Sequence, residues 1–276
     1  MRILLLIVLM TTIAEALPMY NPAGASLLTD GVICTPGPVN YCDPWDSMSF
    51  NIGFTGWYVQ QHPMLAHVKN RPDTIHDFSY RMNGGYLSLN ICDCVEAFSA
   101  IGGTNFSINY PAQTLNKPSS SAKLNVRTDT SYSLNVGGKW SAWECGNFLM
   151  GLEVEYFGAK SRIISVGTTE LKRVHLHYNE WQISGGGSYR INISGCTTAL
   201  LPYAGIHYSR THTSFGKHQS FIDEDGDRLL LISSRSLRHV GYSFGATLVG
   251  CNKIQVTAEA TFISETAFLI NSTFRF

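Results

Sequence analysis

The chain has 276 residues, of which 20 are Lys or Arg and 20 are Asp or Glu, so its formal net charge is zero. A chain of this length can bury a sizeable core, as one large domain or two small ones. The charge balance argues against a basic nucleic-acid binder and against an acidic disordered chain. After the N-terminus, no apolar run reaches the roughly 18 residues that a spanning helix needs. A soluble β domain and a membrane β-barrel both stay open.

The N-terminal residues predict export. Met1-Arg2 supplies one positive charge, residues 3–10 are apolar, and Ala14-Glu15-Ala16 has the A-x-A form of a cleavage site. We therefore expect residues 1–16 to be a secretory signal peptide, with a buried first helix as the alternative. An exported chain folds in a compartment where disulfides persist.

The rest of the chain shows apolar side chains at every second position rather than helical periodicity. The pattern is clearest over residues 254–262 and 266–276, where one face is apolar and the other polar. Each run has about ten residues, the length that a tilted strand needs to cross a bilayer. The same alternation recurs upstream, which predicts an all-β protein.

Ten alternating segments follow one another along the chain, with twelve strands as the alternative count. They are residues 46–60, 75–91, 95–110, 123–143, 147–160, 171–191, 198–213, 229–249, 253–263 and 266–276. We expect residues 46–276 to form an antiparallel transmembrane β-barrel in a bacterial outer membrane. Residues 17–45, rich in Pro and Gly, are expected to be an N-terminal periplasmic leader.

A soluble β-sandwich would alternate too, but two features favour the barrel. The polar faces carry mainly Ser, Thr, Asn and Gly, and aromatic residues gather at strand ends, as in the interface girdles of membrane barrels. The girdle candidates are Tyr58, Tyr110, Trp140, Trp143, Tyr156, Tyr178, Trp181 and Tyr208. Within 171–191 we expect Val174, Leu176 and Tyr178 to face outward, with a bulge near Asn179 that shifts the alternation.

The sequence also resembles the chlamydial major outer membrane protein family of porins, and the chain is shorter than the family's principal members. The resemblance is spread over nearly the whole mature chain. The stretches that carry it are Leu17-Pro18 with Asn21-Pro22-Ala23, Cys42-Asp43-Pro44, Leu89-Asn90-Ile91-Cys92-Asp93, Trp143-Glu144-Cys145-Gly146, Tyr178-Asn179-Glu180-Trp181-Gln182, Pro202-Tyr203-Ala204-Gly205-Ile206 and Asn271-Ser272-Thr273-Phe274-Arg275-Phe276. The resemblance implies a porin that lets small solutes diffuse. A non-conducting structural or adhesive barrel is the alternative.

The cysteines are the candidate disulfide residues. With ten strands and both ends in the periplasm, the short turns near 92–94, 144–146, 192–197 and 250–252 fall on the periplasmic side. The long loops at 61–74, 111–122, 161–170 and 214–228 fall outside. All seven cysteines then lie in periplasmic turns or in the leader: Cys34, Cys42, Cys92, Cys94, Cys145, Cys196 and Cys251. The odd number favours an intermolecular partner, with internal disulfides or free thiols as the alternative.

The resemblance implies partners as well. It implies disulfide links to other cysteine-rich envelope proteins, which would make the chain a structural component of the envelope, and a homotrimer is one possible assembly. Outer-membrane lipid and small solutes are the remaining expected partners, and nucleic acid is not expected.

Charged and titratable residues on the polar faces are the candidate pore-lining residues. They are Lys139, Glu153, Glu155, Arg173, His175, His177, Arg190, His207, Glu259 and Arg275. Charges of both signs across a pore narrow it and predict weak selectivity. The alternative is a barrel too narrow to conduct, because barrels of about eight strands are filled by side chains.

Other signals are weak. Cys92-Asp93-Cys94 lacks a second ligand pair for a metal, and the acidic run 223–227 lacks the Glu that completes a calcium loop, so a solvated loop is favoured there. Nothing in the sequence nominates a Ser, His and carboxylate set for a catalytic site. We expect no cofactor, no metal and no enzymatic activity.

Overall fold

The computed structural model describes residues 21, 48–68, 71–75, 77–91, 94–112, 122–166, 169–170, 174–193, 198–215, 220–222, 228–230, 233–250, 253–263 and 265–276. The predicted signal peptide and leader lie outside these residues, except for Asn21, which is buried. In the described part of the chain, no helix is long and apolar enough to cross a membrane.

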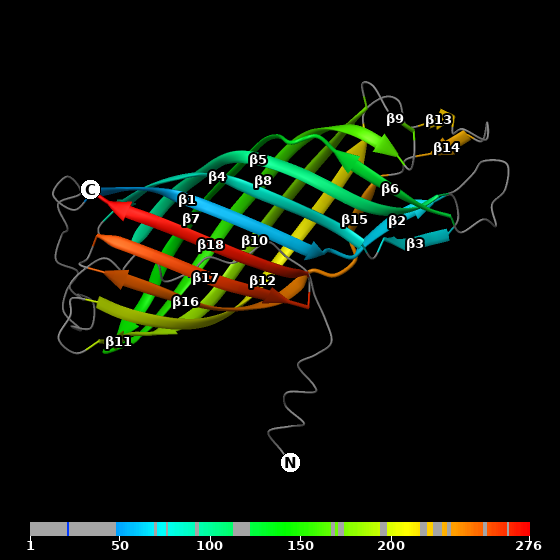
Figure 1. The fold of residues 1–276 in the computed structure, drawn as a ribbon. Coiled ribbons are helices and arrows are strands. Elements are labelled where there is room, and N and C mark those ends of the chain that lie inside the picture. Colours follow the sequence, from blue (N-terminus) through cyan, green and yellow to red (C-terminus); the bar gives the residue numbers. More distant parts are fainter. Residues whose placement is uncertain are drawn as a thin grey trace, which may run out of the picture.

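Ten antiparallel strands close into a ring (Figure 1). In ring order they are β1 (Met48–Gln61), β4 (Asp77–Ile91), β5 (Val95–Ala112), β7 (Ser131–Cys145), β8 (Phe148–Val166), β10 (His175–Tyr189), β12 (Thr198–Phe215), β16 (Val240–Gly250), β17 (Ile254–Phe262) and β18 (Thr266–Arg275). The last strand pairs with the first, with Phe54 opposite Ser272, which leaves no free edge in the ring. The ring confirms the all-β barrel and the count of ten strands.

Short strands extend the ring at one end. β2 (Met64–Val68) and β3 (Arg71–Ile75) form a hairpin, and β2 pairs with β15 (Ser234–Ser236), which in turn pairs with β12. This hairpin lies in a segment that the sequence predicts to be a loop. The other short strands are β6 (Ala122–Thr128), β9 (Thr169–Glu170), β11 (Ile191–Asn192) and the separate pair β13 (Ser220–Ile222) and β14 (Arg228–Leu230).

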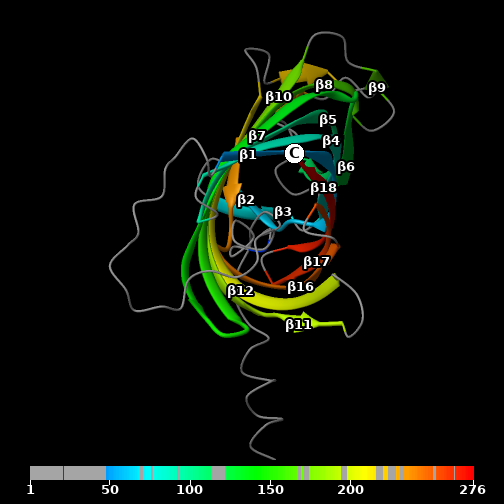
Figure 2. The same ribbon diagram turned by 90° about the vertical axis from the view of Figure 1, so that its left-hand side faces the viewer.

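The two ends of the barrel differ. The start of β1, the C-terminal Phe276 and the turns at Cys94 and at Gly146-Asn147 share one end, called here the short-turn end. The opposite, long-loop end carries the β2–β3 hairpin and the longer connections. Viewed along the barrel from the short-turn end, β2 and β3 lie within the outline of the ring (Figure 2).

The outer wall is apolar on every strand of the ring. Each of the ten strands exposes at least one large apolar side chain: Phe50, Ile52, Phe54, Leu87, Ile101, Leu134, Val136, Leu152, Val154, Ile183, Ile206, Phe244, Leu248, Val256 and Ile270. The opposite positions of the strands are mostly buried. Exposed apolar side chains around a whole closed ring fit a lipid-facing surface and not a soluble sandwich, which hides its apolar faces.

Most of the predicted girdle lies on this outer wall. Tyr58, Tyr156, Trp181 and Tyr208 are exposed toward the long-loop end. Trp140 and Trp143 are exposed toward the short-turn end. The side chain of Tyr110 lies outside the described part.

The predicted bulge near Asn179 is wrong. β10 pairs without a register shift with β8 on one side and β12 on the other. Val174, Leu176 and Tyr178 therefore share the inner face with Glu180, and all four are buried. The expectation failed because it assumed that apolar side chains face lipid, whereas this part of the lumen is itself apolar.

Candidate functional site: the barrel interior

Aromatic side chains cross the lumen in its long-loop half. Six of them form what we call the aromatic plug: Trp57 (β1), Phe78 and Tyr80 (β4), Phe106 (β5), Phe157 (β8) and Tyr178 (β10). All six are at most 2% exposed. Each ring lies two residues from other inward-facing positions of its strand, so the plug continues the inner wall of the barrel.

The contacts within the plug span the barrel rather than follow its wall. The rings of Trp57 and Phe157 have centroids 5.3 Å apart, although three strands separate β1 from β8 along the wall. Phe78 stacks on Tyr178 at 5.5 Å, again with three strands between them. Tyr80 stacks on Phe157 at 5.8 Å. Contacts across the lumen close the passage at this level.

The β2–β3 hairpin adds a second layer to this closure. Met64, Ala66 and Ile75 are at most 1% exposed and belong to the same apolar cluster as the plug. His62, just before the hairpin, lies 5.7 Å from Phe78 between ring centroids and places its Nδ1 3.0 Å from the Glu265 carboxylate. The strand ends, the hairpin and the plug thus pack as one unit at the long-loop end.

Much of the remaining inner wall is polar and acidic. Five buried glutamates, Glu96, Glu153, Glu155, Glu180 and Glu259, face inward together with one lysine, Lys139. We call this set the carboxylate belt. In register, Lys139 lies directly opposite Glu153 on the neighbouring strand, and its ammonium is 5.3 Å from the centre of the Phe98 ring. Five carboxylates facing one ammonium give the lumen a predominance of negative groups.

Three tyrosines donate hydrogen bonds to the belt. The hydroxyl of Tyr86 donates to Glu96 at 2.8 Å, that of Tyr178 to Glu180 at 2.5 Å, and that of Tyr203 to Glu259 at 2.5 Å. Hydrogen bonds to a buried carboxylate offset part of the large cost of removing it from water. Tyr178 therefore joins the two parts of the interior, because its ring belongs to the plug and its hydroxyl to the belt.

Some buried polar groups on β8 and β10 have no hydrogen-bond partner among the described residues. They include both carboxylate oxygens of Glu153 and the whole side-chain amide of Gln182. The two strands pair in register, with Glu155 opposite Gln182 and Glu153 opposite Ser184. Unpartnered polar atoms are costly in a packed interior, so this wall is suited to water or ions rather than to further packing.

The sequence-predicted pore-lining residues divide into three groups. Lys139, Glu153, Glu155, His207 and Glu259 lie buried on the inner face, and Arg275 is half-buried near the end of β18. His175 and His177 occupy outward positions on β10, and Arg190 lies in the connection after it. Arg173 lies outside the described residues.

Glu96, Glu180 and the aromatic plug are not among the site residues that the sequence predicts. Glu180 is absent from the prediction because Tyr178 is expected to face lipid and the alternation is expected to shift only past Glu180, which leaves Glu180 on the outward face. An unbroken alternation through Tyr178, Glu180, Gln182 and Ser184 was the signal that would have found it. Without the bulge, the lumen is more acidic than the set of mixed charges that the sequence predicts.

Of the candidate disulfide residues, the structure describes two. Cys94 lies in the turn between β4 and β5, and Cys145 ends β7 with an exposed side chain. Both are at the short-turn end. Cys34, Cys42, Cys92, Cys196 and Cys251 lie outside the described residues, although the strands that flank positions 196 and 251 also end at the short-turn end.

Together, the closed ring, the lipid-facing wall and the polar inner wall define an outer-membrane β-barrel. The comparison with known sequences agrees. The chain is 25% identical to a "Major outer membrane porin" of Chlamydia pneumoniae and 24% identical to that of Chlamydia trachomatis serovar H, and each alignment covers 95% of both chains. The chain is thus a relative of the chlamydial major outer membrane porins, as its motifs predict. The alignment with the C. pneumoniae protein runs over 374 positions, so that relative carries insertions that this chain lacks.

The comparisons with family models and with solved structures do not extend this assignment. No family model matches the sequence. Among solved structures, the outer membrane protease OmpT of Escherichia coli is 11% identical with a TM-score of 0.41, covering 85% of this chain and 98% of that one. The β domain of the Bordetella autotransporter BrkA is 9% identical with a TM-score of 0.43, covering 84% and 99%. Likeness at these scores says nothing about function.

Proposed function

We propose that the chain is a porin-type barrel that is closed at rest by the aromatic plug and passes small cations when the plug moves aside. The observation that carries this proposal is the set of ring contacts across the lumen, from β1 and β4 to β8 and β10. Similarity to porins along 95% of the chain supports the transport role. The proposal includes no catalytic step.

Conductance in planar bilayers tests the closure. We expect the wild-type barrel to show rare, small openings, because each passage must break stacked aromatic contacts worth about 0.5–1.5 kcal/mol per pair. Replacing Trp57→Ala together with Tyr178→Ala removes rings from both sides of the plug and should give frequent discrete steps. The matched control is Tyr156→Ala with Trp181→Ala, which removes similar rings from the outer wall and should leave conductance unchanged.

The carboxylate belt sets the expected selectivity. Five inward carboxylates against Lys139 favour cations in the passage. In the opened variant, the reversal potential in a KCl gradient should show a cation preference. Adding Glu153→Gln and Glu155→Gln should reduce it. An anion preference would contradict this assignment of the belt.

A non-conducting structural barrel is the second candidate, and the extent of the plug favours it. If this candidate is right, the wild-type protein shows no openings at any voltage, while the variant without Trp57 and Tyr178 still conducts. Openings of the wild type would instead exclude a purely structural role.

The envelope role is proposed from the cysteines. Cys145 is exposed at the short-turn end, where a periplasmic protein could reach it. We expect high-mass species on non-reducing gels of oxidised envelopes, which reductant should convert to monomer and which Cys145→Ser should diminish. Cross-linking of reduced membranes tests separately for a homotrimer.

A further inference from the structure

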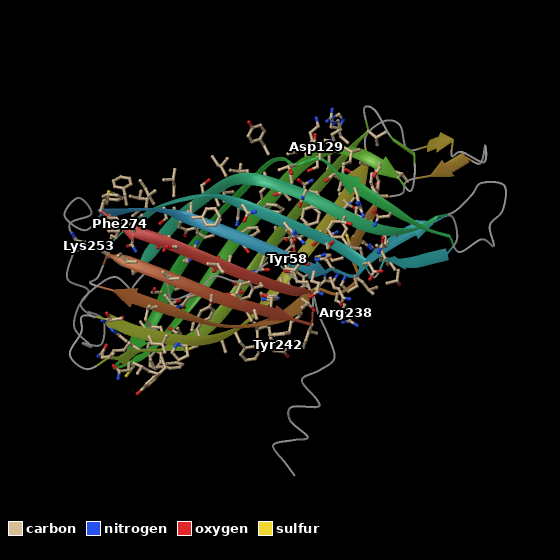
Figure 3. All side chains as sticks on the ribbon, viewed as in Figure 1. Tyr58, Asp129, Arg238, Tyr242, Lys253 and Phe274 are labelled. Carbon is tan, nitrogen blue, oxygen red and sulfur yellow. The ribbon has the colours of Figure 1, made fainter. Side chains whose placement is uncertain are left out.

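The outer wall changes character toward the long-loop end, where it becomes cationic. The described outward side chains there include seven lysines and arginines against two carboxylates, Asp77 and Asp129. The seven are Arg81, Arg127, Lys160, Arg162, Arg210, Arg235 and Arg238. Among the described residues, only Arg162 forms an ion pair with one of the two, at 2.7 Å from Asp129. Figure 3 labels Asp129 and Arg238 on this part of the wall. A barrel wall that meets lipid at this level presents positive charge to the headgroups.

A pocket in this wall gathers two of the arginines. Its lining includes Arg210 from β12, Arg235 from β15 and the imidazole of His239, with Tyr208, Leu65 and Leu237 around them. We call it the basic pocket. Among the described residues, neither Arg210 nor Arg235 is paired with a carboxylate. Planar guanidinium groups without a protein partner match the oxygens of a phosphate.

The surroundings of the basic pocket place it at the depth of lipid headgroups. The ring of Tyr208 contacts both Trp181 and His239, with centroids 5.7 and 5.6 Å away. Tyr208 and Trp181 belong to the aromatic girdle, which marks the boundary between hydrocarbon and headgroups. On the hydrocarbon side of this girdle, Ile183, Ile206 and Phe244 expose an apolar wall that acyl chains can cover.

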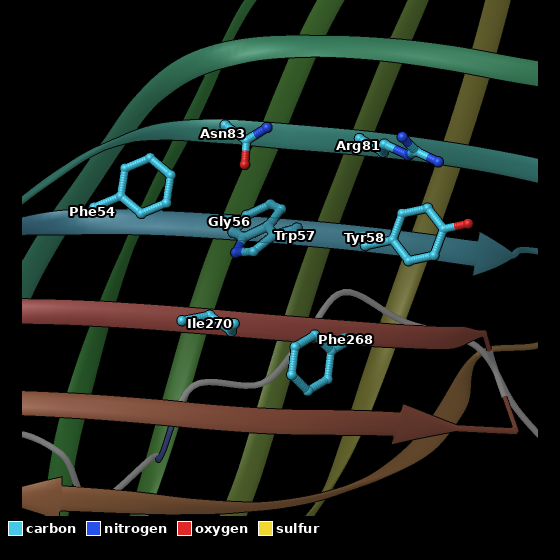
Figure 4. A pocket seen from close by; sticks show the side chains of 8 residues that line it. All are labelled: Phe54, Gly56, Trp57, Tyr58, Arg81, Asn83, Phe268 and Ile270. Carbon is cyan, nitrogen blue, oxygen red and sulfur yellow. The ribbon is translucent and has the colours of Figure 1, made fainter.

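A third arginine shows a similar arrangement on the other side of the barrel. The guanidinium of Arg81 lies 4.7 Å above the ring of Tyr58, beside a groove that also includes Phe54, Phe268 and Ile270 (Figure 4). Here too a cation at the girdle adjoins an apolar groove. The pairing of a cation with an apolar groove at two places suits a molecule with both a phosphate and acyl chains.

We propose that the basic pocket binds the phosphate of a multi-acyl membrane lipid in the leaflet at the long-loop end, with the acyl chains along β10, β12 and β16. Arg210 and Arg235 hold the phosphate, and His239 and Tyr208 flank it. The proposal rests on the outer-membrane location and not on conduction, so it stands or falls apart from the proposed transport role.

Lipid binding to the full-length barrel in detergent tests the proposal, measured by native mass spectrometry. The probe is bis-phosphorylated lipid A, compared with its dephosphorylated form. We expect the phosphorylated form to bind roughly tenfold more tightly, or better, since each basic residue near a membrane surface contributes about a factor of five. If the wild-type barrel bound the phosphorylated and the dephosphorylated form equally tightly, the proposal would be overturned.

Two double variants locate the site. Arg210→Gln with Arg235→Gln should weaken binding of phosphorylated lipid A at least tenfold. Lys253→Gln with Arg190→Gln removes two cations near the short-turn end, where Figure 3 labels Lys253, and should leave the binding unchanged. Heat-modifiable gel migration checks that both variants fold. Unchanged binding by the first variant, or equal loss in the second, would refute the site.

If inorganic phosphate at equal concentration displaces the lipid, the pocket is a phosphate site and the assignment to lipid is wrong.

Discussion

Gly245 shows how one missing side chain positions a hydrogen bond in the lumen. It lies in register between Tyr203 on β12 and Glu259 on β17. A Cβ at Gly245 would fall 2.4 Å from Cζ of Tyr203, so only glycine lets the phenol cross this strand to reach Glu259. Gly245→Val should therefore displace Tyr203 and lower the free energy of unfolding by about 1–3 kcal/mol.

Urea unfolding in detergent, followed by tryptophan fluorescence, measures the effect of Gly245→Val. The matched control is Gly85→Ala, since Gly85 also lies within a strand but a Cβ added there would meet no atom within 4 Å beyond its chain neighbours. The control should stay within about 0.5 kcal/mol of wild type. If Gly85→Ala lowered the free energy of unfolding as much as Gly245→Val, the effect would come from adding any side chain to a strand and not from displacing Tyr203.

His62 gives the long-loop end a pH dependence. It lies between β1 and β2, outside the spanning strands, and complete burial lowers its pKa to about 3. Because the folded pKa lies below the unfolded value of about 6.5, protonation favours the unfolded state. The stability that neutral His62 provides is present above pH 6.5 and is lost progressively as the pH falls toward 3.

The unfolding free energy of the wild type, measured from pH 7 to pH 4, should therefore fall more steeply than that of His62→Gln. The difference should approach about 1.4 kcal/mol per pH unit below 6.5. Parallel curves for the two proteins would show that His62 is protonated in the folded state, as its contact with Glu265 alone would suggest.

The β2–β3 hairpin is the element that supports the aromatic plug. It packs Met64, Ala66 and Ile75 into the cluster that contains the plug, yet it contributes no strand to the ring. Replacing residues 64–75 with a short Gly-Ser linker should leave the barrel folded and raise its conductance. Planar-bilayer recording measures the conductance, and heat-modifiable gel migration checks that the barrel folds. Removing β13 and β14 is the matched control, because that pair forms a sheet apart from the ring and should leave conductance unchanged.

For the whole molecule, the two ends of the barrel predict which residues meet the outside of the cell. Cys145 shares its end with the C-terminus and the short turns, which we expect to be periplasmic. A membrane-impermeant thiol reagent applied to intact, reduced cells should therefore leave Cys145 unlabelled, and lysis should expose it. A cysteine introduced at the exposed Arg238, at the opposite end, is the positive control. Labelling of Cys145 from outside would invert the topology.

The sequence by itself determined the ring of strands, because period-two alternation and aromatic strand ends are local properties that a lipid-facing wall imposes residue by residue. It placed Glu153, Glu155 and Glu259 on the polar face for the same reason. Only the tertiary structure decided that the lumen is closed. Trp57, Phe157 and Tyr178 are far apart in the chain, and alternation cannot distinguish an apolar face against lipid from one packed across a narrow barrel. Ring closure brings them together, since at ten strands side chains from opposite walls can touch.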